Sequence, residues 1–253
     1  MKLEIPVENL LRDLKLHGML EGLARRLKEA EAEGLATEDF LGCLLHDEVT
    51  YRANARVKRL LRTAAFRQAA SLEGMDYAPT RGLDKKRLAD LAGCRFIRDG
   101  VSILILGPTG AGKTYLASAI GNAACRRGHT TLFFRLNNLI EQMALARAKG
   151  TYLNLVRRLA VAEVLILDDF GIKPLQPQQY QDLYDVIDER GEGKSTIITS
   201  QLPPANWSEV IADPVSCEAI TDRLASRAII IEMKGESQRR RRRGADQVPL
   251  DTN

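Results

Sequence analysis

The sequence has few cysteines and no paired cysteine motif. Its four cysteines lie far apart in the chain: Cys43, Cys94, Cys125 and Cys217. None of them forms the C-x-x-C spacing of zinc or redox sites. Apolar runs near residues 101–106 and 228–231 fall far short of the roughly 20 residues of a membrane helix, and no charged-then-apolar leader opens the chain. We therefore expect a protein of the reducing cytoplasm without a membrane partner.

Aromatic residues are also scarce, at 5% of the 253 residues, which favours helix-rich packing on Leu and Ala. The apolar share of 45% and the charged share of 28% are those of an ordinary globular protein. The length allows one sizeable core of roughly 150–180 residues and a smaller appended unit. Two structural parts are expected.

The net charge of +4 is small, but basic residues are concentrated in two regions. Arg239 to Arg243 form an uninterrupted run, and between Arg52 and Arg98 twelve Lys or Arg residues face only four acids. Such patches suit a polyanionic partner. The run near the carboxyl end is typical of a disordered tail that raises general affinity for DNA.

Residues 7–67 are expected to form helices, because leucines recur at three- and four-residue steps from Leu10 to Leu27 and Gly34 breaks the pattern. A second long helix is predicted over residues 38–68. It would place four arginines on one face as DNA-binding candidates: Arg52, Arg56, Arg59 and Arg67. No acid lies between Tyr51 and Ser71 to pair with them. A solvated basic face without a ligand is the alternative.

Five short apolar runs alternate with helix-length segments after residue 100, at 101–106, 131–134, 164–167, 196–199 and 228–231. This order predicts an α/β fold with a parallel five-stranded sheet covered on both faces. The connection Gly74–Gly82, with Pro79, marks the boundary to the helical part. The predicted organisation is a helical DNA- or partner-binding domain (1–70), a linker and start of the α/β domain (71–100), the α/β core (101–235) and the basic tail (236–253).

Residues 107–114 read Gly107, Pro108, Thr109, Gly110, Ala111, Gly112, Lys113 and Thr114. The glycines let backbone N–H groups turn toward phosphate oxygens at the start of a helix, Lys113 would reach the terminal phosphates, and Thr114 would give a hydroxyl to Mg²⁺. Tyr115 opens the helix that follows and is included in the predicted ATP site. A glycine-rich turn without a ligand is the alternative.

Two carboxylates end the predicted strand that begins at Val164. Asp168 is expected in the Mg²⁺ shell, and Asp169 is expected to orient or deprotonate the water that attacks the γ-phosphate. The alternative is that both aspartates cap the next turn.

Polar residues also follow the fourth predicted strand, where ligands bind in open parallel sheets. Thr199, Ser200 and Gln201 are candidates for sensing the γ-phosphate, or simple hydrogen-bonding residues. Before the last strand, Arg223 is the candidate that would reach a neighbouring subunit's nucleotide, and Arg227 is a second candidate. The alternative there is a surface salt bridge to Asp222.

With these motifs in order, the chain resembles the IstB-like ATPases, transposition helper proteins of the AAA+ superfamily that are related to the DnaC helicase loaders. The resemblance covers nearly the whole chain. It is carried by Leu44–Glu48 with Arg52 and Arg56, Gly107–Thr114, Val164–Gly171, Thr196–Gln201 with Pro203 and Trp207, Asp213-Pro214, Asp222–Leu224 and Lys234–Ser237. Two positions differ from the family pattern: Gln201 stands where Asn is common, and Asp169 where Glu is common.

The resemblance implies an ATP-dependent homo-oligomer that binds double-stranded DNA with little sequence preference and assists a transposase in target selection. By position it implies ATP and Mg²⁺ as cofactors, with Lys113, Asp169 and Arg223 as the catalytic residues. The shorter Asp169 suits a slow switch. Only about 20 residues follow the last predicted strand, so a C-terminal helical lid is not expected.

Two other functions remain open from the sequence. A DnaC-like helicase loader would use residues 1–70 to capture a replicative helicase. A small-molecule P-loop kinase would transfer phosphate to an added acceptor.

Overall fold

The structure is a computed structural model that describes residues 6–191 and 193–235. The arginine run Arg239–Arg243 and the predicted tail 236–253 lie outside the described residues. The chain divides into two compact units, Met1–Arg59 and Leu60–Asn253, and each has its own apolar core. No helix in the described ranges is long and apolar enough to cross a membrane.

The first unit contains α1 (Val7–Asp13), α2 (His17–Glu33) and α3 (Thr37–Ala64) as far as Arg59. Its core is small and holds Leu11, Met19, Leu23 and Leu44. Gly18 permits a close approach of α2 to α3, because a Cβ there would lie only 2.6 Å from the Asp47 carbonyl oxygen. Helix-period leucines therefore produce the predicted helices and also the seam between them.

Carboxylates of α3 reinforce this seam. Glu48 is 5% exposed, and its Oε2 accepts hydrogen bonds from the backbone N–H groups of Gly18 (2.6 Å) and Met19 (3.2 Å) at the start of α2. The first N–H groups of a helix have no partner within the helix, so Glu48 satisfies two of them. Asp47 accepts two hydrogen bonds from Arg26, at 2.9 and 2.7 Å.

The second unit is built on a five-stranded sheet with the order β2-β3-β4-β1-β5, and all strand pairs are parallel. The strands are β1 (Ile103–Leu106), β2 (Thr131–Arg135), β3 (Val164–Phe170), β4 (Ser195–Ser200) and β5 (Ile229–Glu232). Each coincides with one of the five predicted apolar runs, so the α/β class and the parallel sheet are confirmed.

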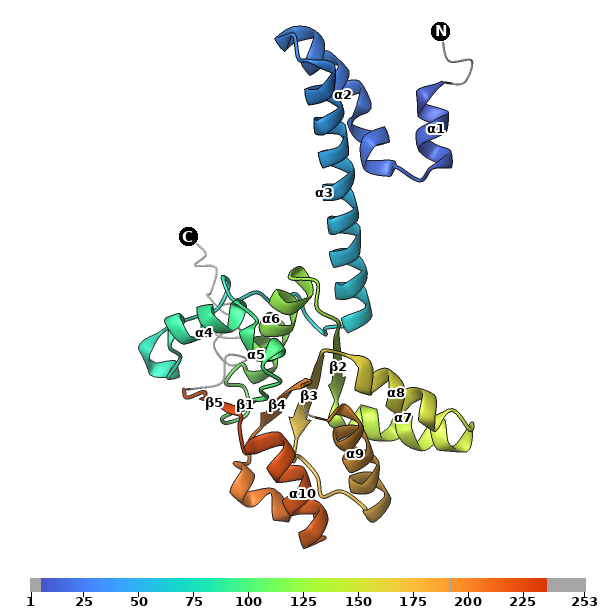
Figure 1. The fold of residues 1–253 in the computed structure, drawn as a ribbon. Coiled ribbons are helices and arrows are strands. Elements are labelled where there is room, and N and C mark those ends of the chain that lie inside the picture. The colour runs from blue at the N-terminus through green and yellow to red at the C-terminus, as the bar shows by residue number, and fades with distance from the viewer. Residues whose placement is uncertain (1–5, 192, 236–253) are drawn as a thin grey trace, which may run out of the picture. The chain divides into compact units, whose positions relative to one another are not determined.

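Helices cover both faces of this sheet (Figure 1). One face carries Ile103, Ile105 and Ile166 and packs against α6 (Lys113–Arg126) and α4 (Lys85–Ala92). The other carries Leu104, Leu165 and Ile198. It packs against α7 (Leu136–Ala148), α8 (Tyr152–Val161), α9 (Pro177–Arg190) and α10 (Pro214–Ala225). Alternate strand residues thus enter opposite cores, which explains the continuous apolar runs.

The second unit begins before the predicted boundary at Gly74–Gly82. Leu60 and Ala64 at the end of α3 pack against Cys125 of α6, and Leu72 and Met75 enter the main core. The rest of the predicted linker folds as η1 (Pro79–Arg81), α4 and α5 (Arg95–Arg98). Apolar residues within a polar, glycine-containing stretch account for the difference, since their burial requires tertiary partners. Two further elements, η2 (Pro204–Glu209) and α10, lie between β4 and β5.

Candidate nucleotide-binding site

The phosphate loop turns sharply between β1 and α6. Gly107, Gly110 and Gly112 have φ of 147°, 83° and 95°, values that favour glycine. Gly112 is the N-cap of α6, so the positive end of that helix faces the loop. The Lys113 amine donates hydrogen bonds to the carbonyl oxygens of Gly107 (2.7 Å) and Pro108 (2.9 Å). The loop therefore forms a cationic cradle for an anion.

Thr114 and Asp168 meet at the edge of this cradle. The Thr114 hydroxyl lies 2.9 and 3.1 Å from the two carboxylate oxygens of Asp168, and the Thr199 hydroxyl donates to Asp168 Oδ1 at 2.6 Å. Burial raises the pKa of Asp168, although the bonds from Thr199 and Thr114 act in the opposite direction. A cation beside Thr114 and Asp168 would compensate for the cost of burying this carboxylate.

Asp169 has a different environment from its neighbour. It lies at an irregularity between Leu167 and Phe170 in the β3–β4 pairing, and its φ of 63° is uncommon for a residue other than glycine. Its N–H donates to the Thr199 hydroxyl at 3.0 Å. The irregular backbone directs the Asp169 carboxylate into the cavity, where Arg135 Nε lies 3.2 Å from Oδ2.

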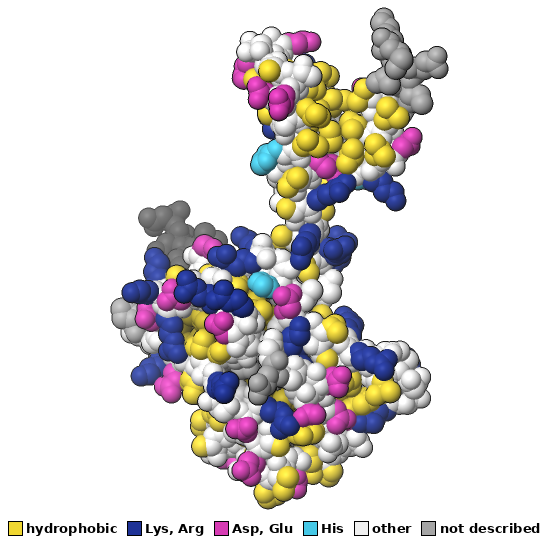
Figure 2. Space-filling view, in the orientation of Figure 1, with side chains coloured by type: hydrophobic (Ala, Val, Ile, Leu, Met, Phe, Trp, Pro, Cys, Tyr) yellow, Lys and Arg dark blue, Asp and Glu magenta, His cyan; other side chains and the backbone are white. Residues whose placement is uncertain are grey.

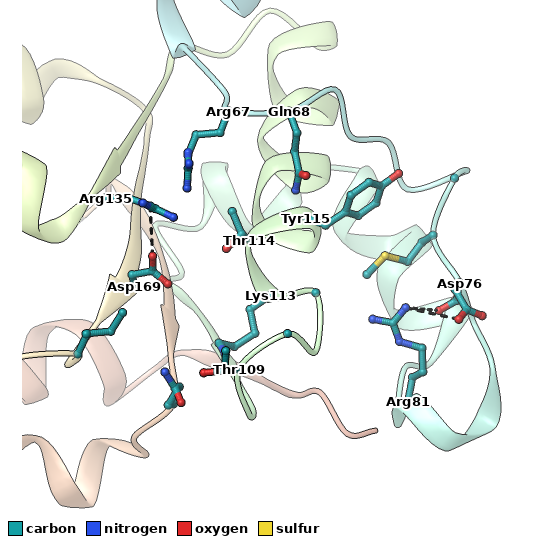
Figure 3. A pocket seen from close by; sticks show the side chains of 16 residues that line it. Arg67, Gln68, Asp76, Arg81, Thr109, Lys113, Thr114, Tyr115, Arg135 and Asp169 are labelled. Atoms are coloured by element: carbon teal, nitrogen blue, oxygen red, sulfur yellow. Dashed lines mark hydrogen bonds and ion pairs between the residues drawn. The ribbon is translucent and has the colours of Figure 1, made fainter. Parts of the chain in front are cut away.

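A cavity of about 500 Å³ joins the phosphate loop to the segment that precedes α4. It is lined by Lys113, Thr114, Tyr115, Arg135 and Asp169, by Thr109, Gly110, Gly112, Ile172 and Gln201, and by Arg67, Gln68, Gly74, Met75, Asp76 and Arg81. Figure 3 shows Arg67, Arg135 and Asp169 around the side of the cavity next to Thr114, with Asp76 and Arg81 on the opposite side. The Tyr115 hydroxyl donates to the Ser71 carbonyl at 3.3 Å.

Arg81 connects the side of the cavity that contains Asp76 to the phosphate loop. Its side chain is buried and donates to the Ala111 carbonyl oxygen at 2.5 Å. A Cβ on Gly112 would come within 2.8 Å of the same guanidinium, so the loop sequence allows this close contact. Asp76 Oδ2 lies 3.6 Å from Arg81 NH1.

The structure separates the three sensor candidates. Gln201 lines the cavity, whereas Thr199 and Ser200 are buried. Thr199 holds Asp168, and the Ser200 hydroxyl donates to the Phe170 carbonyl oxygen at 2.9 Å. Of the three, Gln201 has access to a ligand in the cavity.

Arg223 and Arg227 do not line the cavity. Arg223 donates to Asp188 Oδ1 of α9 at 2.7 Å, and its guanidinium lies 5.0 Å from the centre of the Tyr184 ring. Arg223 therefore forms a surface salt bridge, as the predicted alternative has it, but its partner is Asp188 of α9 and not Asp222. Arg227 is exposed and has no ion pair within the described ranges.

The structure differs from the predicted arginine face on α3 at the first and the last of its four arginines. Arg52 pairs with Glu48, one turn earlier, at 2.7 Å, so the expectation that this face lacks intrahelical partners is wrong for Arg52. Arg56 and Arg59 are exposed on α3. The helix ends at Ala64, where the next residue, Ala65, has a φ of 57°. Arg67 therefore leaves the helical face and lines the cavity.

Arg135 and Arg81 were not among the predicted site residues. Arg135 is the last residue of β2 and pairs with Asp168 in the β2–β3 register, so the rule that ligands bind at the carboxyl ends of parallel strands could have found it. Arg81 had no comparable local signal, because its role depends on the packing of residues 70–81 against the phosphate loop.

Solved structures share this fold. The AMPPCP-bound DnaA of Aquifex aeolicus aligns with a TM-score of 0.58 and 18% identity, over 75% of this chain and 58% of that one. The DnaC helicase loader aligns with a TM-score of 0.56 and 21% identity, over 65% of this chain and 97% of the loader. At these identities the likeness shows a common fold.

Sequence relatives are much closer. The insertion sequence ATP-binding protein y4pL of Sinorhizobium fredii is 39% identical over 94% of this chain and 97% of its own length. The ATP-binding protein Rv3427c in an insertion sequence of Mycobacterium tuberculosis is 36% identical over 94% of this chain and 95% of its own length. The family described as IstB-like ATP binding protein matches residues 9–245. The chain therefore belongs to the IstB-like ATP-binding proteins and is a P-loop ATPase.

Proposed function

We propose that this ATPase is an oligomeric, largely sequence-nonspecific DNA-binding protein that assists a transposase in target selection and stimulates DNA transposition. The observation that carries the proposal is the cavity in which the phosphate loop, Asp169 and Arg135 meet, with the buried Asp168 bonded to Thr114 at its edge. The relatives of the chain bear the names of insertion-sequence proteins. ATP acts as a switch for assembly in this proposal.

The phosphates of ATP bind to the loop N–H groups and to the Lys113 amine. To reach the phosphates, Lys113 gives up its hydrogen bonds to the Gly107 and Pro108 carbonyl oxygens. Asp169 orients the attacking water from its position at the irregularity of β3. Gln201 contacts the terminal phosphate from the end of β4. Lys113, Asp169 and Gln201 line the cavity, as do the loop residues Thr109, Gly110 and Gly112.

Thr114 and Asp168 fit a magnesium ion, since a hydroxyl and a buried carboxylate converge at 2.9 Å. No group of three or more His, Cys, Asp or Glu residues that could hold a metal occurs in the described part of the chain. Mg²⁺ in such sites keeps one or two protein ligands and completes its shell with water and phosphate oxygens. Bound there, it would neutralise charge on the leaving phosphate.

Arg56 and Arg59 of α3 are proposed to contact the phosphate backbone of DNA, since both are exposed cations on one helix. Figure 2 shows Lys and Arg side chains on the visible face of α3. Replacing both by Ala should weaken duplex binding and lower the salt slope by about one unit per lost contact, with ATP hydrolysis retained. Unchanged DNA affinity would remove α3 from the interface.

Arg223 is proposed to complete the site of a neighbouring copy, because it is partly exposed on α10 and does not reach the cavity of its own chain. ATP hydrolysis per chain should then rise with protein concentration. Arg223→Ala should abolish that rise and keep ATP affinity. A wild-type rate independent of concentration would contradict action between subunits.

The decisive experiment is sedimentation of the protein with a random-sequence duplex in the presence of ATP, ADP or neither. Wild type should form large complexes with ATP, and Lys113→Ala should not. Lys149→Ala serves as the control, because Lys149 is exposed and does not line the cavity. DNA binding indifferent to nucleotide would overturn the proposal. Absence of DNA binding, with capture of a replicative helicase, would favour a helicase loader.

A further inference from the structure

We propose that Arg67 binds the terminal phosphates of ATP from within the same chain and thereby couples the nucleotide to the end of α3. The inference rests on the ATP site described above. It assigns to Arg67 a role different from the DNA contact that the sequence predicts.

The first argument is charge. The cavity is lined by four cationic side chains, Arg67, Arg81, Lys113 and Arg135, and by two acidic ones, Asp76 and Asp169, a balance of +2. Arg81 interacts with Asp76, and Arg135 with Asp169. Within the described part of the chain Arg67 has no ion-pair or hydrogen-bond partner. A cation without a partner beside a phosphate cradle is a ready contact for an anionic ligand.

The second argument is position. Figure 3 shows the Arg67 side chain extending into the cavity on the side where Thr114, Arg135 and Asp169 lie. Thr114 and Asp169 mark the end of the cavity where the terminal phosphates and the attacking water are expected. Asp76 and Arg81 mark the other end. Arg67 therefore approaches the part of the ligand that distinguishes ATP from ADP.

The third argument is anchoring. Ala64, the last residue of α3, is buried with Leu60 and Cys125. The Phe66 ring packs edge-on against Phe133, with centroids 6.2 Å apart. Ala70 is buried on the other side of Arg67. Since both flanks are fixed in the core, a phosphate held by Arg67 is connected to the last turn of α3 by only three residues.

The test compares Arg67→Ala with Arg62→Ala in the full chain. Arg62 is an exposed arginine in the last turn of α3 that does not line the cavity, so it matches the change in charge. Binding of fluorescent ATP and ADP analogues gives the two affinities. Arg67→Ala should weaken ATP binding about tenfold, the size of one charge-assisted contact, and ADP binding less than about threefold. Arg62→Ala should change neither.

Amide hydrogen exchange over residues 60–70 supplies a second measurement. ATP should protect this segment more than ADP in wild type and in Arg62→Ala, and equally in Arg67→Ala. Equal weakening of ATP and ADP, or unchanged affinities with reduced DNA binding, would overturn the inference. Failure of the wild type to bind ATP would instead overturn the proposed ATP switch, so the two ideas fail separately.

Discussion

The two units use charge in different ways. In the first unit, charged side chains of α2 and α3 link the two helices around a small apolar core. Glu48 accepts hydrogen bonds from two backbone N–H groups, and Asp47 accepts a hydrogen bond from Arg26. In the second unit two apolar cores enclose the sheet. Several charges line the cavity, whereas others lie outside it, such as Arg190 at buried carbonyls and Arg147 beside Asp182. A unit with few apolar residues depends on polar contacts for its helix pairing, whereas a larger core leaves charged groups available for chemistry.

Arg190 is the strongest test of this contrast, because it is a buried charge of the second unit outside the cavity. It donates to the carbonyl oxygens of Leu159, Ala162 and Ser195 at 2.6, 2.9 and 2.7 Å, and burial lowers its pKa to about 10. Arg190→Met should lower the free energy of unfolding by about 3–5 kcal/mol, since each buried acceptor without a donor costs about 1–3 kcal/mol. Urea unfolding measures this.

Arg158→Met is the matched control, because Arg158 is exposed on α8. Its stability should be close to that of wild type. Equal losses for both variants would mean that the three carbonyl contacts of Arg190 do not stabilise the second unit.

Glu48 tests the first unit. Glu48→Gln should destabilise it by about 1–2 kcal/mol, because a neutral amide accepts the Gly18 and Met19 N–H groups more weakly. Burial opposes the charge of Glu48, but bonds from Arg52, Met19 and Gly18 outweigh it and lower its pKa below 4.5. This stabilisation is therefore present above pH 4.5 and is lost as the pH falls below it.

Protection of the Gly18 and Met19 amides from hydrogen exchange, measured between about pH 3 and pH 7, follows this loss directly, because that range spans the titration of a carboxylate. Glu31→Gln, on an exposed position of α2, should keep the wild-type pH dependence. A pH dependence that survives in Glu48→Gln would assign it to another carboxylate.

Arg135 shows whether a cavity charge serves chemistry and not stability. Arg135→Gln should lower kcat for ATP hydrolysis about fivefold, because Asp169 loses the partner that holds its carboxylate, and general bases contribute about 10²–10⁴ in rate when well placed. KM and the unfolding midpoint should stay close to wild type. Arg157→Gln, exposed on α8, should leave kcat unchanged. A fall in the free energy of unfolding of Arg135→Gln would mean that Arg135, like Arg190, stabilises the fold.

Arg25 is expected to give the smallest effect. It reaches Glu29 and Asp47 at 3.0 Å, but its side chain is 54% exposed. Arg25→Ala should change the free energy of unfolding by less than about 0.5 kcal/mol, the usual range of exposed ion pairs. A larger loss would show that the exposed charges of the first unit act as a network with Arg26 and Asp47.

Much of the second unit could be predicted locally. Each apolar run became a strand within two residues of its predicted start, and the glycines at 107, 110 and 112 adopt the positive φ that the phosphate loop needs. Thr114 and Asp168 meet although 54 residues separate them. They do so because the start of α6 and the end of β3 lie at one edge of a parallel sheet.

Other parts of the site could not be read from local patterns. Helix periodicity predicts Arg67 on the arginine face of α3, but the helix ends at the buried Ala64, and Ala65 turns the chain with a φ of 57°. Thr199 looked like a sensor of phosphate, yet its hydroxyl is used by Asp168.

The sequence by itself determined the ATPase fold, the phosphate loop and the pair of acidic residues, because these depend on strand periodicity, glycine conformation and spacing along the chain. The tertiary structure decided which charges share the cavity. Arg67, Arg81 and Arg135 come from three separate segments, and only the packing of residues 60–81 and of β2 against the core brings them to the phosphate loop.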